Sequence, residues 1–229
     1  MKKMYTKQQV AKTIDHAVLK PEFTDDDLRK HAQMCIENGV YSMCVKPCDI
    51  KEAKSLLSKS DVKVSCVLSF PHGHDATPVK AFQAKQAIED GTDEIDMVMN
   101  IGKFLSGDYD YVREDIKAVV KVAHKNNVLV KVIQESGHLT PEQIAKACEL
   151  SQEAGADFVK TSTGFGPGKA TPENVGIMLK TVGDKMKVKP SGGIRTWEDA
   201  VAFLKQGAHR LGIGSTETVL QGGTAEGDY

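Results

Sequence analysis

Short apolar runs rich in β-branched residues alternate along the whole chain with longer amphipathic stretches. Runs of the first kind, bounded by Gly, Pro, Asn or Ser, are typical of buried strands, whereas apolar positions spaced three and four residues apart predict helices. The predicted strands are 13–19, 42–45, 63–68, 94–99, 129–133, 158–160, 187–189 and 210–213. The predicted helices are 24–38, 47–58, 77–90, 108–126, 140–154, 171–182 and 196–206.

The ends of the predicted helices carry the expected capping residues. Thr140, Thr171 and Thr196 stand at N-cap positions, and helices stop at glycines such as Gly39 and Gly207. Eight β/α units of roughly 28 residues each are typical of a (β/α)₈ TIM barrel, which needs about 250 residues. A doubly wound sheet is the alternative, but it carries a glycine fingerprint after its first strand, and none follows 13–19. We therefore expect one barrel domain spanning 1–229.

The alternation within the strands predicts which side chains face the barrel axis. In 94–99 the apolar Ile95, Met97 and Met99 form the helix-facing set, so Asp96 points inward together with Glu94 and Val98. The same parity turns Lys131, Lys160, Lys187 and Lys189 inward. Because catalytic groups of such barrels lie at the carboxyl ends of the strands, Asp96, Lys131, Lys160 and Lys189 are expected to meet at the mouth.

Two amines held close together suggest carbonyl chemistry. A lysine of ordinary pKa, about 10.4, is almost never neutral at pH 7, but a neighbouring ammonium and partial burial lower the pKa. Lys160 beside Lys189, 29 positions apart in the chain, is such an arrangement, and the natural reaction is Schiff-base formation. The alternative is a structural salt-bridge network, although three lysines and one aspartate leave excess positive charge.

Two glycine-rich turns predict an anion site. Ser191, Gly192 and Gly193 follow 187–189, and Gly214 and Ser215 follow 210–213. Glycine lets backbone N–H groups approach a ligand, and barrels often bind phosphate at the last two units. Ordinary turns also use glycine, but two such turns in consecutive units favour a phosphate site.

Metal sites are the less favoured interpretation of two other motifs. His72 and His74, with Asp75 beside them, could be interpreted as a zinc site, but no further ligand is evident from spacing, and a polar loop is favoured. Cys44 and Cys48 have no partner pair, so a zinc site there is improbable. Cys44 is expected to face the mouth, as an ordinary core cysteine or as a thiol open to aldehydes.

Composition excludes several classes of partner. The 30 basic and 31 acidic residues give a net charge of −1, so neither a nucleic acid nor a membrane is implied. The N-terminus carries lysines but no apolar h-region, and no run is long enough to span a membrane. The five cysteines are odd in number and scattered, which favours reduced thiols in a cytoplasm over a disulfide framework.

Motifs spread over nearly the whole chain resemble those of the deoxyribose-phosphate aldolases, class I enzymes with a (β/α)₈ barrel. The most specific are KTSTGF (160–165) and VKPSGGIR (188–195). The others are IDHAVLKP (14–21), MCVKP (43–47), SFPHG (69–73), DEIDMVMNIG (93–102), SGDYD (106–110), VKVIQES (130–136) and GIGST (212–216).

The resemblance implies reversible cleavage of 2-deoxy-D-ribose 5-phosphate to acetaldehyde and D-glyceraldehyde 3-phosphate, without metal or organic cofactor. It makes Lys160 the Schiff-base lysine, Asp96 and Lys189 the proton-transfer pair, and the GGIR and GIGS turns the phosphate site. We expect Thr163, Gly164 and Asp15 to line the pocket. A homodimer is also expected, because dimers are common in the family.

The last residues and two rival functions complete the expectations. The tail, about 221–229, is expected to be mobile, and Tyr229 is either a participant in proton transfer or part of a disordered end. One rival is another phosphate-binding barrel enzyme, either a different lysine aldolase or a sugar-phosphate isomerase. The isomerase would use a carboxylate base such as Glu135 in place of paired lysines. A catalytically silent sugar-phosphate binder would bind ligand without imine chemistry.

Overall fold

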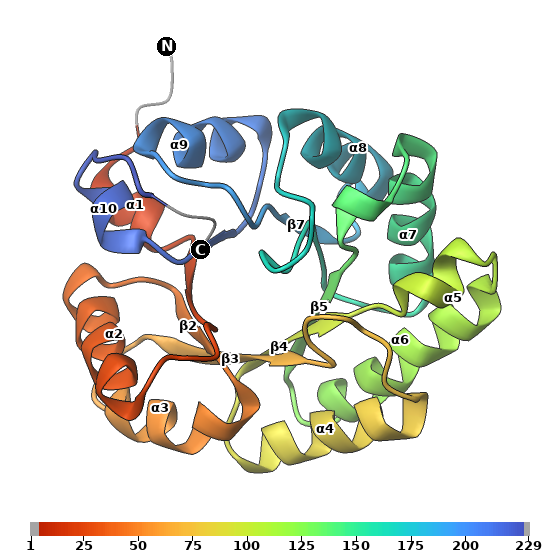
Figure 1. The fold of residues 1–229 in the computed structure, drawn as a ribbon, viewed down its shortest axis with the longest axis horizontal. Helices are drawn as coiled ribbons and strands as arrows, with labels where there is room; N and C mark the ends of the chain where they lie inside the picture. Colours follow the sequence, from red (N-terminus) through yellow and green to blue (C-terminus); the bar gives the residue numbers. More distant parts are fainter. Residues whose placement is uncertain (1–4, 227–229) are drawn as a thin grey trace.

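The protein is a barrel of parallel strands surrounded by helices (Figure 1). The computed structural model describes residues 5–226. Its strands are β1 (Ile14–Val18), β2 (Ser42–Val45), β3 (Lys63–Leu68), β4 (Glu94–Val98), β5 (Leu129–Ile133), β6 (Phe158–Lys160), β7 (Lys187–Lys189) and β8 (Leu211–Ile213). The order β7-β6-β5-β4-β3-β2-β1-β8 places sequence neighbours side by side. A bridge between Ser191, which follows β7, and Gly212 on β8 closes the barrel. The predicted (β/α)₈ barrel is confirmed.

Helices connect the strands and cover the outside of the sheet (Figure 1). They are α1 (Lys7–Ala11), α2 (Asp25–Asn38), α3 (Ile50–Leu56), α4 (Thr77–Glu89), α5 (Ile101–Leu105), α6 (Tyr109–His124), α7 (Pro141–Glu153), α8 (Pro172–Val182), α9 (Trp197–Gln206) and α10 (Thr216–Leu220). Two 3₁₀ turns, η1 (Pro47–Asp49) and η2 (Ser136–His138), precede α3 and α7.

The long helices begin and end where the capping residues predict. Thr140 and Thr196 each form a capping box, in which the threonine hydroxyl accepts from a backbone N–H and the side chain three residues on accepts in return. Gly39 and Gly207 end α2 and α9 in the left-handed conformation, at φ 60° and 115°. The short helices α1, α5 and α10 were not predicted, because five residues show no helical periodicity.

All five residues of β4 are buried, so its predicted parity is confirmed by which side chains join the core between sheet and helices. Ile95, Met97 and Met99 are fully buried in the large core between sheet and helices. A second, smaller apolar cluster lies on the inner face of the first three strands, and its members are Ala17, Leu19, Cys44 and Val67, with Phe70 packed against them. The barrel therefore has an apolar inner wall at β1–β3, and its lysines come from β5–β7.

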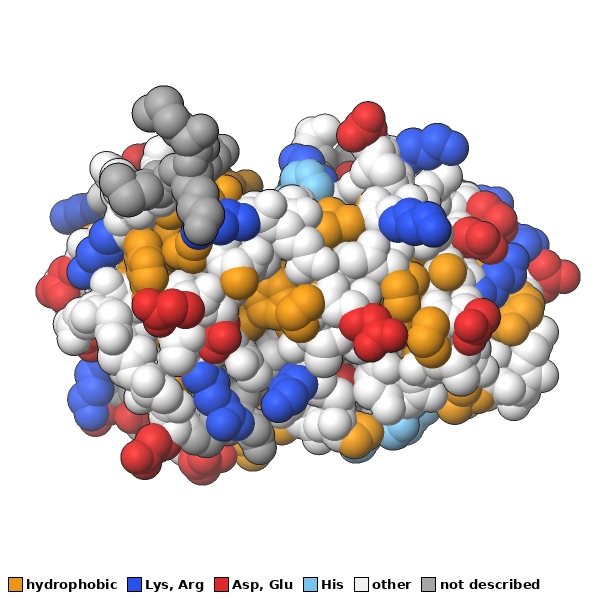
Figure 2. All heavy atoms as spheres, turned by 90° about the horizontal axis from the view of Figure 1, so that it is seen from above, with side chains coloured by type: hydrophobic (Ala, Val, Ile, Leu, Met, Phe, Trp, Pro, Cys, Tyr) orange, Lys and Arg blue, Asp and Glu red, His pale blue; other side chains and the backbone are white. Residues whose placement is uncertain are grey.

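The outer surface carries no segregated charge on the face drawn in Figure 2, where acidic and basic side chains are interspersed. Within residues 5–226, no helix is both long and apolar enough to cross a membrane. Ala225, in the C-terminal segment, is 9% exposed and donates its N–H to the carbonyl oxygen of Arg195 at 3.0 Å. Tyr229 lies outside the described residues, so its role stays a prediction.

Candidate active site

The strands bring four predicted side chains together inside the barrel. Asp96 on β4 pairs in register with Lys131 on β5, and Lys160 on β6 pairs with Lys189 on β7. Each of the four is at most 1% exposed. Charged groups this deeply buried are stable only when they are paired.

Asp96 is the acceptor that all three lysines share. Its Oδ1 accepts from Lys131 Nζ at 2.7 Å, and its Oδ2 accepts from Lys160 Nζ at 2.9 Å and from Lys189 Nζ at 2.7 Å. Burial by itself would raise the pKa of Asp96, but the three ammonium groups outweigh burial and hold that pKa well below its usual range. Asp96 is therefore a carboxylate at neutral pH, placed between two amines.

Three further charged residues extend this cluster below the mouth. Arg210 donates to Asp15 at 2.6 Å and to both oxygens of Glu94 at 3.1 and 3.2 Å. Lys131 lies 2.6 Å from Glu94 Oε2, and Lys189 lies 2.6 Å from Asp15 Oδ2. Asp15, Glu94 and Arg210 thus form a layer of buried ion pairs, which is the structural network considered above as the alternative to a catalytic cluster. Asp15 belongs to the layer, and its expected place on the pocket wall stays a prediction.

The pKa directions agree with that description. Burial would raise the pKa of Asp15, but Lys189, Lys131 and Arg210 together hold it far below the usual value. Burial would lower the pKa of Lys131, but Asp96 and Glu94 raise it well above the usual value. Lys131 is therefore a fixed cation, which makes it a poor nucleophile.

Cys44 lies at the mouth, on the apolar inner wall. Its side chain is 1% exposed, and burial raises the pKa of the thiol. Because the thiolate is the reactive form, this environment favours the interpretation of Cys44 as a core residue.

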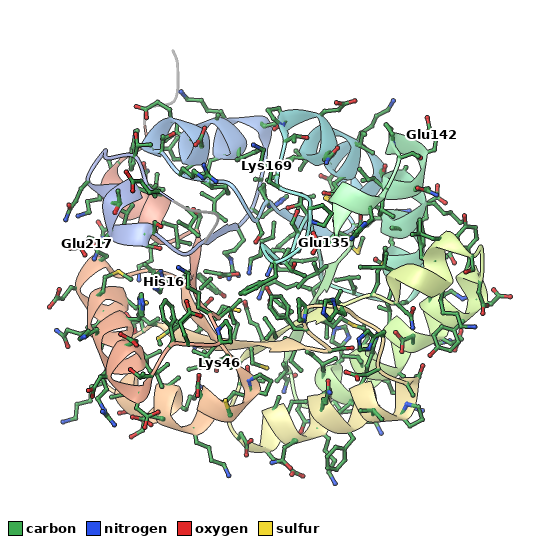
Figure 3. The ribbon with its side chains drawn as sticks, in the orientation of Figure 1. His16, Lys46, Glu135, Glu142, Lys169 and Glu217 are labelled. Atoms are coloured by element: carbon green, nitrogen blue, oxygen red, sulfur yellow. The ribbon has the colours of Figure 1, made fainter. Side chains whose placement is uncertain are left out.

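The turn after β6 is fixed by Glu135, which stands where β5 ends (Figure 3). The backbone N–H of Thr163 donates to Glu135 Oε2 at 3.2 Å, and the Thr163 hydroxyl donates to the same oxygen. A side chain at Gly166 would meet that carboxylate at 2.7 Å. Gly164, at φ 86°, lets the chain reverse directly after Thr163. Glu135 therefore holds in place the turn that follows Lys160.

The two glycine-rich turns lie next to this segment. Gly192 and Gly193 adopt φ of 82° and 73°, and Gly214 and Ser215 are partly buried at the end of β8. Thr161 joins the segments, because its hydroxyl donates to Ser191 O and accepts from Ser191 N–H, each at 2.9 Å. The structure thus brings the predicted phosphate turns beside the strand that carries Lys160.

Sequence reasoning missed two residues at these turns. Lys169 is an exposed lysine (Figure 3) whose aliphatic chain lies so close to Gly193 that a methyl group there would be 3.0 Å from Lys169 Cδ. Ser162 is fully buried beside Gly192, and its hydroxyl has no hydrogen-bond partner within residues 5–226. A lysine in a Gly-Pro-Gly-Lys loop was a usable signal for the first, whereas nothing in the sequence distinguishes Ser162 from a turn serine.

The candidate zinc ligands do not form a metal centre with a third residue. The rings of His72 and His74 stack at 5.5 Å, and both side chains are exposed. Among residues 5–226, no group of three or more His, Cys, Asp or Glu side chains could hold a metal ion.

Proteins of known sequence or structure are similar to this chain over nearly its whole length. Residues 9–222 match the DeoC/LacD family aldolases. The deoxyribose-phosphate aldolase of Thermococcus gammatolerans is 54% identical over 215 residues, covering 93% of this chain and 96% of that protein. A putative deoxyribose-phosphate aldolase from Coccidioides immitis superposes with a TM-score of 0.92 at 36% identity, over 95% of this chain and 86% of its own. The enzyme from Aeropyrum pernix, described as a tetramer, gives 0.88 at 31% identity, over 94% and 91%.

Proposed function

This chain belongs to the DeoC/LacD family of aldolases, and we propose that it cleaves 2-deoxy-D-ribose 5-phosphate reversibly to acetaldehyde and D-glyceraldehyde 3-phosphate through a Schiff base on Lys160. It is a carbon–carbon lyase of deoxyribonucleoside catabolism. The observation that carries the catalytic assignment is the single carboxylate oxygen of Asp96 that contacts two buried amines, Lys160 and Lys189.

In the cleavage direction the free amine of Lys160 attacks the C1 aldehyde carbon of the open-chain sugar. The carbinolamine loses water to give an iminium, whose cationic nitrogen accepts the electron pair of the C2–C3 bond as that bond breaks. The C3 hydroxyl loses its proton at the same step, so C3 becomes the aldehyde of glyceraldehyde 3-phosphate. The enamine left on Lys160 is protonated at C2, and hydrolysis releases acetaldehyde.

Asp96 and Lys189 carry the protons of this sequence. Asp96 Oδ2 is within hydrogen-bond distance of both amines, so it can take a proton from Lys160 before the attack and return it during hydrolysis. Lys189 supplies a second exchangeable proton 2.7 Å from the same oxygen. Lys131 and Arg210 hold Asp96, Glu94 and Asp15 in place through ion pairs. This chemistry needs no metal or organic cofactor.

The substrate phosphate is assigned to the turns after β7 and β8, with Ser191, Gly192, Gly193, Gly214 and Ser215 around it. The positive φ of both central glycines and the adjoining exposed ammonium of Lys169 support this assignment. The Ser162 hydroxyl, which has no hydrogen-bond partner among residues 5–226, offers a further donor beside Gly192. Thr163, Gly164 and Asp15 are proposed to line the remaining pocket.

The rival functions have weaker support. An isomerase would need a carboxylate that is free to move a proton, and Glu135 is buried with one oxygen engaged twice by Thr163. A silent binder would have no reason to hold two amines against one carboxylate. All five cysteines are free thiols, which supports the proposed cytoplasmic location. A homodimer is proposed as the assembly, and light scattering on the purified protein would measure it.

Borohydride trapping tests the imine. The protein is incubated with acetaldehyde or with deoxyribose 5-phosphate, reduced, and digested for peptide mass spectrometry. We expect a reduced adduct on Lys160 in the wild type and none in Lys160→Arg, which keeps the charge but is a far poorer nucleophile. An adduct on Lys189 or Lys131 would reverse the assigned roles and keep the class. Binding of sugar phosphate without any adduct would overturn the proposal.

A further inference from the structure

A buried hydrogen-bonded chain reaches from the surface to the end of β8. His16 on β1 is 1% exposed, and its Nδ1 lies 2.8 Å from Thr216 Oγ1. Its Nε2 lies 2.8 Å from Nδ1 of His31 on α2, a partly buried residue packed against Phe23. Figure 3 shows His16 beside α2, and its parity on β1 is opposite to that of the inward-facing Ala17. The aldol chemistry described above uses none of these side chains.

The protonation state of His16 limits which atoms can donate in the hydrogen bonds that link His31, His16 and Thr216. Burial, reinforced by the neighbouring His31, lowers the pKa of His16 to about 3, so the ring is neutral and carries one N–H at neutral pH. Each of its two short contacts must contain one hydrogen. His31 Nδ1–H can donate to His16, and His16 Nδ1–H then donates to Thr216, whose hydroxyl is left to donate to Ile213 O at 3.5 Å. The reversed order, in which Thr216 donates to His16 and His16 to His31, keeps the same contacts.

Thr216 lies where this chain can affect ligand binding. It is the first residue of α10 and directly follows Gly214 and Ser215. Behind it, β8 pairs with β1, with His16 opposite Ile213. In front, Gly212 bridges Ser191, and a methyl group on Gly212 would be 2.5 Å from Ser191 Oγ and 3.3 Å from Lys189 Cε. A small shift of Thr216 would therefore move the turn at Gly214 and Ser215, which directly precedes it in the chain. That turn follows Gly212, which contacts Ser191 and Lys189.

We propose that His16 is a positioning residue for the phosphate half of the substrate. His16 is oriented by its hydrogen bond to His31 and forms a second hydrogen bond to the Thr216 hydroxyl. These contacts fix the position of the Gly214–Ser215 turn relative to the Ser191–Gly193 turn. The inference rests on the proposed phosphate site and assigns His16 no part in bond making or breaking. The hydrogen bonds of His16 should therefore affect phosphorylated sugars more than unphosphorylated ones, because the phosphate contacts the turn and the reacting carbon does not.

The test compares kcat/KM for deoxyribose 5-phosphate with kcat/KM for deoxyribose in matched variants. Thr216→Val removes the hydroxyl and keeps the β-branched shape, and Thr216→Ser keeps the hydroxyl. His16→Asn can place an amide near the former Nδ1 and retain the Thr216 contact, whereas His16→Gln places it near Nε2 and loses that contact. We expect the ratio to fall about three- to tenfold in T216V and H16Q, the range for one lost neutral hydrogen bond. It should stay near wild type in T216S and H16N.

Inorganic phosphate supplies an independent probe, since its inhibition constant should rise by the same factor in T216V and H16Q. Equal losses toward both sugars in T216V and T216S, with an unchanged phosphate inhibition constant, would reduce His16 to a core residue and overturn the inference. Failure of the proposed function is distinguishable, because it would appear in the wild type as absent turnover and absent trapping on Lys160. Variants that fold poorly are recognised by their thermal midpoints, and the phosphate inhibition constant of whichever of T216V and H16Q keeps its midpoint then decides the case.

Discussion

Lys160 and Lys189 occupy paired positions on neighbouring strands, and both ammonium groups donate to Oδ2 of Asp96, at 2.9 and 2.7 Å. The two amines are equally buried, each at 1% exposure. Lys189 also lies 2.6 Å from Asp15 Oδ2, which ties it to the ion layer below. Lys189 therefore connects the Asp96 oxygen that it shares with Lys160 to Asp15, a position that suits the proton-transfer role proposed for it.

Lys189→Met should reduce kcat by about 10²–10⁴-fold, the usual contribution of one acid–base group, while acetaldehyde is still trapped slowly on Lys160. Steady-state cleavage kinetics and borohydride trapping measure the two effects separately. Lys187→Met is the matched control, because Lys187 lies on the same strand but is exposed. Equal losses in both variants would contradict the role assigned to Lys189.

Lys131→Met should destabilise the fold by about 3–5 kcal/mol, the range for breaking a buried ion pair from one side. The substitution leaves Glu94 and Asp96 buried without the ammonium that lies 2.6 and 2.7 Å from them. Urea unfolding followed by circular dichroism gives the free energy of unfolding. Lys117→Met, at a side chain that is 59% exposed, should change it by less than about 0.5 kcal/mol.

The stability contributed by Asp15 should depend on pH in a defined direction. Its pKa is lower in the folded protein than the usual 3.9 or so, since Lys189, Lys131 and Arg210 outweigh burial. Its contribution is therefore complete above about pH 4 and is lost as the pH falls through the lower folded value. Asp15→Asn should destabilise most at pH 7, and the difference from wild type should narrow below pH 4. Urea midpoints from pH 3 to 7 test this, and a constant difference would contradict it.

Gly166→Ala should disturb the turn after Lys160, because the added methyl would lie 2.7 Å from Glu135 Oε2. We expect a loss of about 1–3 kcal/mol in stability, typical of overpacking, together with slower aldol cleavage. Gly102→Ala is the control, since a methyl there meets its nearest neighbour, Asn100 Oδ1, at 3.8 Å. Thermal midpoints and kcat for both proteins are the measurement. A harmless Gly166→Ala would show that Glu135 does not fix the turn.

The alternation along the strands predicted which side chains face the barrel axis, but it did not predict how deeply each one is buried. Lys187 was expected to face the axis, and its Nζ does lie 5.6 Å from the ring of Phe158, yet at the open bottom of the barrel it stays exposed. Arg210 was expected only as the start of a strand, but its guanidinium joins Asp15 and Glu94. Such partners come from strands far apart in the sequence, and local alternation carries no information on which inward side chains meet.

The turns proposed to bind phosphate also show that local sequence does not predict which side chains from distant segments meet. Glycines at Gly192 and Gly193 were visible in the sequence, because they mark the backbone conformation itself. Lys169 was missed because it reaches the site from the loop after β6, across the hydrogen bond from Ala170 N–H to Gly192 O. Only the packing of two loops reveals a contact of that kind.

The junction of Asp15, Glu94 and Arg210 also bears on how the chain folds. Asp15 and Glu94 lie on β1 and β4, and Arg210 directly precedes β8, so the ion layer is complete only after β8 has been added. An N-terminal half-barrel would bury two carboxylates without their guanidinium, at a cost that burial of its apolar residues would have to exceed. The barrel should therefore assemble as one cooperative unit, and stable half-barrel intermediates should not accumulate.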